Sequence, residues 1–186
     1  MPPKVRVTKE NIIKTATELV RQSGADAINA RAIASALGCS TQPIFSNFAT
    51  MDEMKVAVIQ SVQELFDAYT SREIESRIYP EYKATGMAYI RFAKQEKELF
   101  KLLYMRDRSG ESSPTDLEFE AGIEAIVRNN VGLDHDTARL FHLEMWTCVH
   151  GIATMFASGF LDLEWELVSK MCTDMYLGLK MQYGVE

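Results

Sequence analysis

The stretch NARAIASALGCSTQPIFSNF, residues 29–48, carries polar side chains at a spacing suited to reading the edge of a DNA groove. Ile44 and Phe48 are one helical turn apart, which predicts the buried side of a short helix over about residues 41–47. The outward side then consists of Thr41, Gln42, Phe45, Ser46 and Asn47. Small polar groups with one aromatic ring can contact base edges, phosphates and thymine methyl groups, so we expect this side to face a DNA major groove.

A helix this short is not stable alone, so neighbouring segments must hold it in place. A preceding helix over about residues 30–37 is predicted by apolar side chains at helical spacing, which are Ala30, Ile33, Ala34 and Leu37. We expect Asn29 to cap the start of that helix and Gly38 to end it in the left-handed conformation. Ser40 is expected to cap the second helix, which completes a helix-turn-helix arrangement.

At these residues the chain resembles the tetracycline-repressor-like (TetR) family of bacterial transcription regulators. The matching positions are residues 31–34 (RAIA), Gly38, Ser40, Ile44, Phe45, Phe48, Asp52 and Glu53. The family usually has Leu-Tyr where this chain has Ile44-Phe45, a His or Tyr at Asn47, and a Lys at Met51. The changes at Phe45 and Met51 remove a hydroxyl and a cation from this surface, and Lys55 can replace the charge. The resemblance covers the first third of the chain.

The resemblance implies a recognition helix, Thr41 to Asn47, that each copy of a homodimer places in a major groove of a palindromic operator. The two half-sites would lie about 34 Å apart, or a multiple of that distance. Base edges are expected to contact Gln42 and Ser46. Thr41 and Phe45 are expected to contact phosphates or thymine methyl groups, and Arg31 and Lys55 are expected to contact phosphates. The remaining predicted DNA-binding residues are Ser40, Pro43 and Asn47.

Helix signals continue along the whole chain and predict an all-α fold. Thr8 is expected to cap a first helix that ends at Gly24 and packs on the two short helices. Thr50 and Glu53 form a capping box, in which the Thr50 hydroxyl accepts from the Glu53 amide and the Glu53 carboxylate accepts from the Thr50 amide. We therefore predict a three-helix DNA-binding head over residues 1–49 and a helical-bundle domain for ligand binding and dimerisation over residues 50–186.

The predicted helical-bundle domain begins with a long helix from residue 51 to about residue 78. Pro80 begins the next helix, which a polar bend at residues 94–98 separates from an apolar helix at 99–105. A further helix starts after Ser113-Pro114-Thr115-Asp116. The last two helices span about residues 134–158 and 161–183.

The last two helices carry apolar residues around more of their circumference than one buried face needs, which favours a four-helix bundle with a second copy. In the family that this chain resembles, these helices usually form the dimer surface. The predicted interface consists of Phe141, Met145, Cys148, Ile152, Val168, Met171, Met175 and Leu179. The alternative is a helix pair that forms the core of a monomer.

The domain is rich in methionine and aromatic side chains of the kind that line an apolar ligand cavity. By analogy with the family, we expect a small-molecule effector to contact Phe66, Tyr69, Tyr89, Phe92, Phe100, Leu103, Tyr104, Phe119, Ile123, Trp146, His150 and Met155. The same residues suit a plain hydrophobic core. The segment WTCVHGIATMFASG, residues 146–159, is also similar to a ligand-domain helix of many TetR-like regulators, and His150 there either binds the ligand or a nearby backbone carbonyl.

Composition excludes several classes of protein. The chain has a formal charge of −6, yet residues 1–50 hold six basic and three acidic side chains, so the head is positively charged. Three histidines and three cysteines show no metal-ligand spacing, and nucleophile or phosphate-loop motifs are absent, so no enzyme, metal or cofactor is expected. There is no apolar run long enough for a membrane helix and no signal peptide, which predicts a cytoplasmic protein.

The sequence therefore predicts a homodimeric repressor that a small, mostly apolar ligand releases from operator DNA. The alternative is a helical-bundle protein that binds ligands or other proteins and whose degenerate head does not bind DNA. The loss of a cation at Met51 is the feature that favours this alternative.

Overall fold

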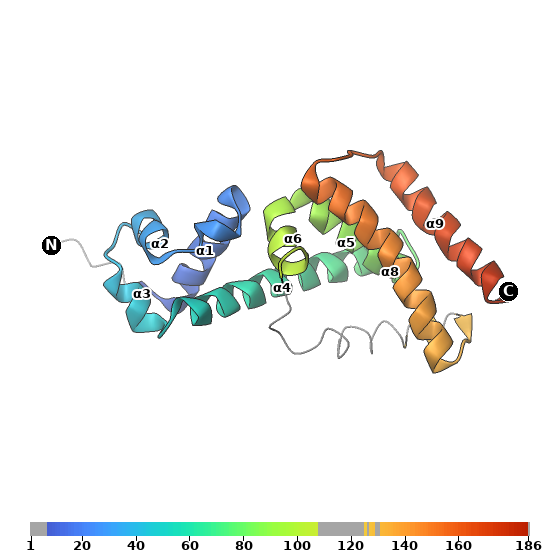
Figure 1. Ribbon diagram of the computed structural model, residues 1–186, viewed down its shortest axis with the longest axis horizontal. Helices are drawn as coiled ribbons and strands as arrows, with labels where there is room; N and C mark the ends of the chain where they lie inside the picture. Colours follow the sequence, from blue (N-terminus) through green and yellow to red (C-terminus); the bar gives the residue numbers. More distant parts are fainter. Residues whose placement is uncertain (1–6, 108–124, 126, 129–130, 186) are drawn as a thin grey trace. The chain divides into compact units, whose positions relative to one another are not determined.

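The structure is a computed structural model that describes residues 7–107, 125, 127–128 and 131–185. Every regular element within these residues is helical, which confirms the predicted all-α fold (Figure 1). The chain divides into two compact units: Met1–Asp67 with Glu96–Arg106, and Ala68–Gln95 with Asp107–Glu186. These units differ from the division into residues 1–49 and 50–186, which concerns function and stays a prediction.

The first unit is built around helix α1 (Lys9–Ser23). Helix α1 contacts a short 3-10 turn η1 (Ala25–Ala27), α2 (Ala30–Ala36), α3 (Gln42–Asn47) and α6 (Lys97–Tyr104). The unit also contains most of α4 (Met51–Glu75). Its core consists of side chains with little or no exposure, including Ile12, Ala16, Val20, Ile33, Ile44, Phe48, Met54, Val58 and Phe100.

Most of the predicted helix caps in the first unit are confirmed. The Thr8 hydroxyl accepts from the Asn11 amide at 3.2 Å, and the Asn29 side chain accepts from the Ala32 amide at 2.8 Å. Gly38 has a φ of 64°, in the left-handed region. The prediction for Ser40 is wrong, because the N-cap of α3 is Thr41, without a side-chain hydrogen bond.

The capping box of α4 is confirmed in one half only. The Thr50 hydroxyl accepts from the Glu53 amide at 3.1 Å, as predicted. The Glu53 carboxylate accepts from the Ala49 amide at 2.7 Å, one residue before the predicted donor. The box therefore fixes the chain just before α4, immediately after the recognition segment.

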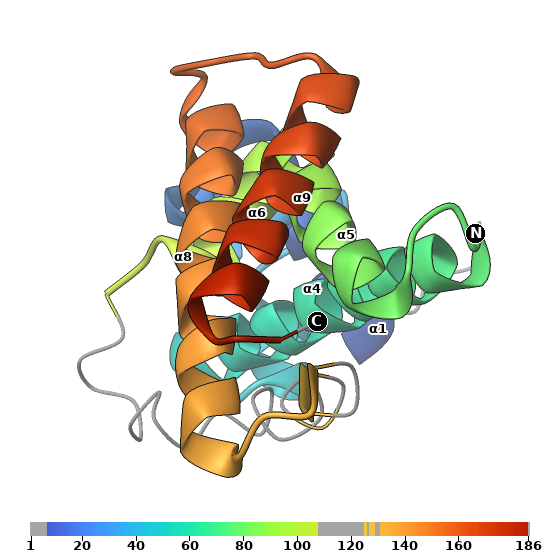
Figure 2. The same cartoon turned by 90° about the vertical axis from the view of Figure 1, so that its right-hand side faces the viewer.

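The second unit packs α5 (Glu81–Gln95) against α8 (His135–Ser158) and α9 (Trp165–Gln182) (Figure 2). Two tyrosine–histidine hydrogen bonds, Tyr82 with His142 and Tyr89 with His150, show that α5 and α8 run in the same direction. A Cβ at Gly86 would lie 3.3 Å from Val149, so α5 comes close to α8 there. The carboxylate of Asp134 caps α8, and Gly159 ends it with a φ of 71°.

Polar contacts hold α9 against α5 in the opposite direction. The Lys83 ammonium donates to the hydroxyls of Ser169 and Thr173, both at 2.8 Å. The Arg91 guanidinium lies 4.3 Å from the centroid of the Trp165 ring and donates to the buried Glu73 carboxylate at 2.9 Å. Hydrophobic packing and the contacts of these half-buried cations therefore both hold the helices of this unit together.

Three predictions about elements lie outside the described residues or differ from the structure. The helix start at residues 113–116 lies outside them. Helix α9 begins at Trp165 instead of near residue 161, and α4 ends at Glu75 instead of near residue 78. No helix in the described part of the chain has the length and apolar character needed to cross a membrane.

Candidate functional site

The side chains of α3 are divided into a buried and an outward side, as predicted. Ile44 has no exposed surface and Phe48 is 2% exposed, whereas the Phe45 side chain is 52% exposed. The other outward residues are exposed or half-buried: Ser40, Thr41, Gln42, Pro43, Ser46 and Asn47. The helix therefore presents polar groups and one phenyl ring on a surface that its buried residues hold in place.

Hydrogen bonds inside α3 decide which of these polar groups remain available. The Ser46 hydroxyl donates to the Gln42 carbonyl at 3.0 Å, and the Asn47 amide donates to the Pro43 carbonyl at 2.7 Å. Each side chain keeps acceptor capacity after this bond. The Gln42 amide group makes no hydrogen bond within the described residues, so it keeps both its donors and its acceptor. Since Pro43 occupies the first turn, its missing N–H costs no helical hydrogen bond.

Three cations lie on exposed parts of the head. Arg31 is exposed on α2, and the Lys55 ammonium lies 3.7 Å from the Asp52 carboxylate with both groups accessible to water. The Lys9 ammonium lies 4.7 Å from the centroid of the Phe48 ring and 3.4 Å from Glu53. Sequence reasoning missed Lys9, because only the folded chain brings the first turn of α1 beside the end of α3.

The predicted ligand-binding residues are distributed over the two units. Four of them, Phe66, Phe100, Leu103 and Tyr104, belong to the first unit. Six belong to the second unit: Tyr69, Tyr89, Phe92, Trp146, His150 and Met155. Phe119 and Ile123 lie outside the described residues.

Within the first unit, the predicted aromatic ligand-binding residues pack on one another. The Tyr104 ring lies 5.9 Å from that of Phe66 and 5.1 Å from that of Phe100, measured between centroids. Phe100 has no exposed surface.

Within the second unit, three side chains form a polar and aromatic cluster between α5 and α8. The buried Tyr89 hydroxyl lies 2.9 Å from His150 Nδ1, and the Trp146 ring stacks on the imidazole with centroids 4.7 Å apart and planes 16° apart. Burial lowers the pKa of His150 below its ordinary value of 6.5 and favours the neutral imidazole. When Tyr89 donates to Nδ1, the imidazole carries its proton on Nε2 and can act as a donor there.

A second pair of the same kind lies two helical turns away. The Tyr82 hydroxyl is 3.0 Å from His142 Nδ1, and burial raises the pKa of Tyr82 and lowers that of His142. Sequence reasoning missed this pair. The seven-residue spacing of the tyrosines and the eight-residue spacing of the histidines both correspond to about two turns, which is the signal that was available.

The residues of the predicted dimer interface differ in their exposure within the protomer. Phe141, Met145, Ile152 and Val168 are 6% exposed or less, so they belong to the core of the second unit. Cys148, Met171 and Leu179 are half-buried, and Met175 is 39% exposed. The apolar residues that α8 and α9 do present to water are Leu140, Leu143, Leu167, Met175, Leu177 and Met181.

A family model described as the tetracyclin repressor-like C-terminal domain matches residues 82–174. The chain belongs to the TetR family of transcriptional regulators. This assignment confirms the family that the residues around α2 and α3 resemble, although the matched residues lie in a different part of the chain. A comparison with curated proteins finds no match.

Several solved structures share the fold along nearly the whole chain. A TetR-like transcriptional regulator from Rhodococcus sp. RHA1 has 13% identity and a TM-score of 0.70, over 99% of both chains. A protein of unknown function from the same organism has 20% identity and a TM-score of 0.69, over 97% of both. The multidrug binding protein EbrR, solved with imidazole, has 18% identity and a TM-score of 0.63, over 90% of this chain and 88% of EbrR.

The two tyrosine–histidine pairs predict a pH-dependent stability for this TetR family member. Because burial lowers the pKa of His142 and His150 in the folded state, the unfolded chain binds more protons once the pH falls through the unfolded value of 6.5. Stability is therefore greatest above that value and decreases as the pH falls. We expect the melting temperature to fall between about pH 7.5 and pH 5.5, before most carboxylates titrate.

Thermal unfolding of the single His142→Gln and His150→Gln variants measures this contribution. Each variant should show a smaller fall in melting temperature over that pH range than the native chain. His135→Gln is the matched control, because the His135 side chain is 62% exposed. An unchanged pH dependence in both buried-histidine variants would contradict the assignment.

Proposed function

We propose that this TetR family regulator is a repressor that binds a palindromic operator as a homodimer. The observation that carries the proposal is the outward side of α3, where the Gln42 amide is fully available beside an exposed phenyl ring. Ile44 and Phe48 are buried in the core of the head and thereby hold the outward side chains in place. An amide with two donors and one acceptor can form the paired hydrogen bonds that identify an adenine in the major groove.

The other residues of the surface take different roles in this proposal. The Ser46 hydroxyl, which already donates within the helix, accepts a hydrogen bond from a base edge. Phe45 and Thr41 contact thymine methyl groups or phosphates, and Ser40, Pro43 and Asn47 shape the surface around them. Arg31, Lys55 and Lys9 bind phosphates. The ion pairs of Lys55 with Asp52 and of Lys9 with Glu53 are exposed and therefore weak, so both lysines can exchange their partner for a phosphate.

The dimer is proposed to form through the exposed faces of α8 and α9. Leu140 and Leu143 on α8 and Leu177 and Met181 on α9 place apolar groups on this surface. Packing these faces on those of a second copy gives a four-helix bundle and removes the apolar groups from water. Two recognition helices are then available for the two half-sites of one operator.

The effector is proposed to bind in the second unit, at the cluster of Tyr89, Trp146 and His150. An aromatic wall with one imidazole suits a small, mostly apolar molecule that accepts a hydrogen bond. Tyr69, Phe92 and Met155 are the further lining residues that we propose in this unit. Release of DNA requires only that the ligand favour a dimer whose recognition helices no longer match the operator. The coupling free energy between ligand binding and DNA binding would be about 1 to 3 kcal/mol.

The experiment that tests DNA binding is selection of genomic fragments by the purified protein, followed by titration of the best fragment at several salt concentrations. We expect a palindromic site bound far more tightly than random DNA. Gln42→Ala should relax the preference at one base pair per half-site by about 1 to 3 kcal/mol. Lys55→Ala should weaken binding to all sequences and reduce the salt slope by about one.

Lys97→Ala is the control for the lysine, because Lys97 is exposed on α6, outside the proposed surface. Equal effects of Gln42→Ala and Lys55→Ala on all sequences would overturn their separate roles. If no sequence is selected, the head is degenerate. The function would then be that of a dimeric protein that binds ligands or other proteins, an alternative supported by the missing cation at Met51.

The proposed dimer surface predicts the effect of introducing charge on it. Leu143→Glu and Leu177→Glu should each raise the dimer dissociation constant by more than about tenfold, because a carboxylate would be buried unpaired. Sedimentation velocity over a range of concentrations measures this. Ile78→Glu, at an apolar residue that is 69% exposed outside α8 and α9, should leave the dimer intact. Dimers of unchanged stability in both leucine variants would exclude this surface.

The proposed effector site can be tested through the two tryptophans of the chain, Trp146 and Trp165. Compounds that release the operator should quench the fluorescence of the Trp165→Leu variant, in which only Trp146 emits. Trp146→Leu should require about tenfold more compound for release, since it loses an aromatic wall. If both variants need the same compound concentration to release the operator, and the compound does not quench Trp146 fluorescence, the effector binds elsewhere.

A further inference from the structure

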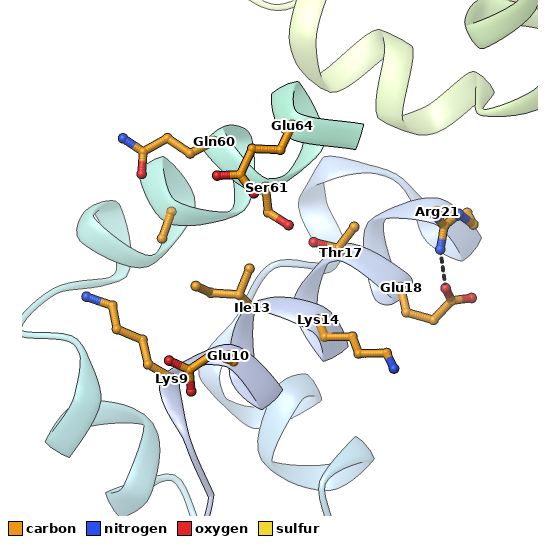
Figure 3. A pocket seen from close by; sticks show the side chains of 11 residues that line it. Lys9, Glu10, Ile13, Lys14, Thr17, Glu18, Arg21, Gln60, Ser61 and Glu64 are labelled. Atoms are coloured by element: carbon orange, nitrogen blue, oxygen red, sulfur yellow. Dashed lines mark hydrogen bonds and ion pairs between the residues drawn. The ribbon is translucent and has the colours of Figure 1, made fainter. Parts of the chain in front are cut away.

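A cavity of about 590 Å³ lies in the first unit, between α1 and α4 (Figure 3). Its walls are the residues of one α1 face, including Ile13, Thr17 and Arg21, and the α4 residues Ala57, Ser61 and Glu64. The volume is within the usual range for small-molecule sites. The cavity contains none of the outward residues of α3 and none of the proposed effector residues, and it shares only Lys9 with the proposed phosphate contacts.

The strongest sign of a site is an unpartnered hydroxyl in its wall. Thr17 is only 9% exposed, and its Oγ1 atom is buried with no hydrogen-bond partner among the described residues. A threonine in a helix can satisfy its hydroxyl on the carbonyl four residues earlier, but Thr17 does not do so. Figure 3 shows its side chain on the α1 wall, facing Ser61 across the cavity. An unsatisfied buried hydroxyl is costly, and a ligand in the cavity would supply the missing partner.

The charges around the cavity decide which ligand fits. Arg21 donates to Glu18 and Glu96, and Lys9 pairs with Glu53. The Lys14 side chain points away from α4 in Figure 3. The described residues contain no ion-pair partner for Glu64, on the α4 wall. Besides the buried Thr17 hydroxyl, the lining offers the exposed Glu64 carboxylate and the half-buried Ser61 hydroxyl, and all three groups can accept hydrogen bonds.

We propose that this cavity binds a small organic ammonium, a protonated primary amine on a short apolar body. The ammonium has three donors, which match the Thr17 and Ser61 hydroxyls and the Glu64 carboxylate. The apolar body packs on Ile13 and Ala57, the half-buried apolar side chains of the two walls. This is a second ligand site, in the first unit, and it does not depend on whether the protein binds DNA.

The test uses phenethylamine as the probe, with phenethyl alcohol and phenylacetate as neutral and anionic counterparts of similar shape. Amide chemical shifts of the full-length protein, labelled with nitrogen-15, are followed during each titration. We expect phenethylammonium to cause saturable shifts at Thr17, Ala57 and Ser61, and the other two compounds to bind at least about tenfold more weakly. Equal shifts from all three compounds, or none that saturate, would overturn the proposal.

Two variants identify the groups that bind. Thr17→Val keeps the shape of the side chain and should weaken phenethylammonium binding by about fivefold, and Glu64→Gln should weaken it by at least as much. Thr15→Val on α1 and Glu75→Gln on α4 are matched controls outside the cavity walls, and they should leave the affinity unchanged. Equal effects of Thr17→Val and Thr15→Val would contradict the role of Thr17.

The stability of Thr17→Val gives an independent check that needs no ligand. Because the hydroxyl has no partner in the unliganded protein, its removal should not lower the melting temperature. A clear loss of stability would show that the hydroxyl is already bonded, by water or by the chain, and would remove the reason for the site.

Discussion

Burial of Ile44 and Phe48 is the constraint on which the DNA-reading surface depends. Helix α3 has six residues, too few for a helix to persist in water, since nucleation costs more than so few hydrogen bonds return. Burying each of these two side chains contributes about 1.5 to 3 kcal/mol, which is enough to hold the segment on α1. The orientation of Gln42 and Phe45 is therefore fixed by the core beneath them.

The second unit is held together differently. Its helices carry the buried core expected of a bundle, but α5 also makes polar contacts with both neighbours. A histidine or lysine at such a contact is desolvated and must keep its hydrogen bond, so these contacts specify the register of the helices more than they add stability. Protonation of His142 or His150 at Nδ1 would remove the acceptor that faces the tyrosine hydroxyl in this contact.

Sequence reasoning was most successful where structure is local. The caps at Thr8 and Asn29 depend only on residues within one helical turn, and both are present. The burial of Phe141 and Ile152 within the protomer could not be predicted, because a helix with two apolar sides does not indicate which side faces its own core. Lys9 and Thr17 could not be assigned from sequence, since their environments are created by contacts between α1 and residues far along the chain.

Two glycines give a physical reason to expect a partner on α8 and α9. Gly151 and Gly178 lie inside helices, where glycine costs about 1 kcal/mol relative to alanine. A Cβ added at either position would meet nothing within 4 Å, so packing inside the protomer does not require them. A glycine on an open helix face lets another helix approach closely. The proposed dimer would use that close approach, and dispersion attraction between the closely packed helices would offset the helix stability lost at the two glycines.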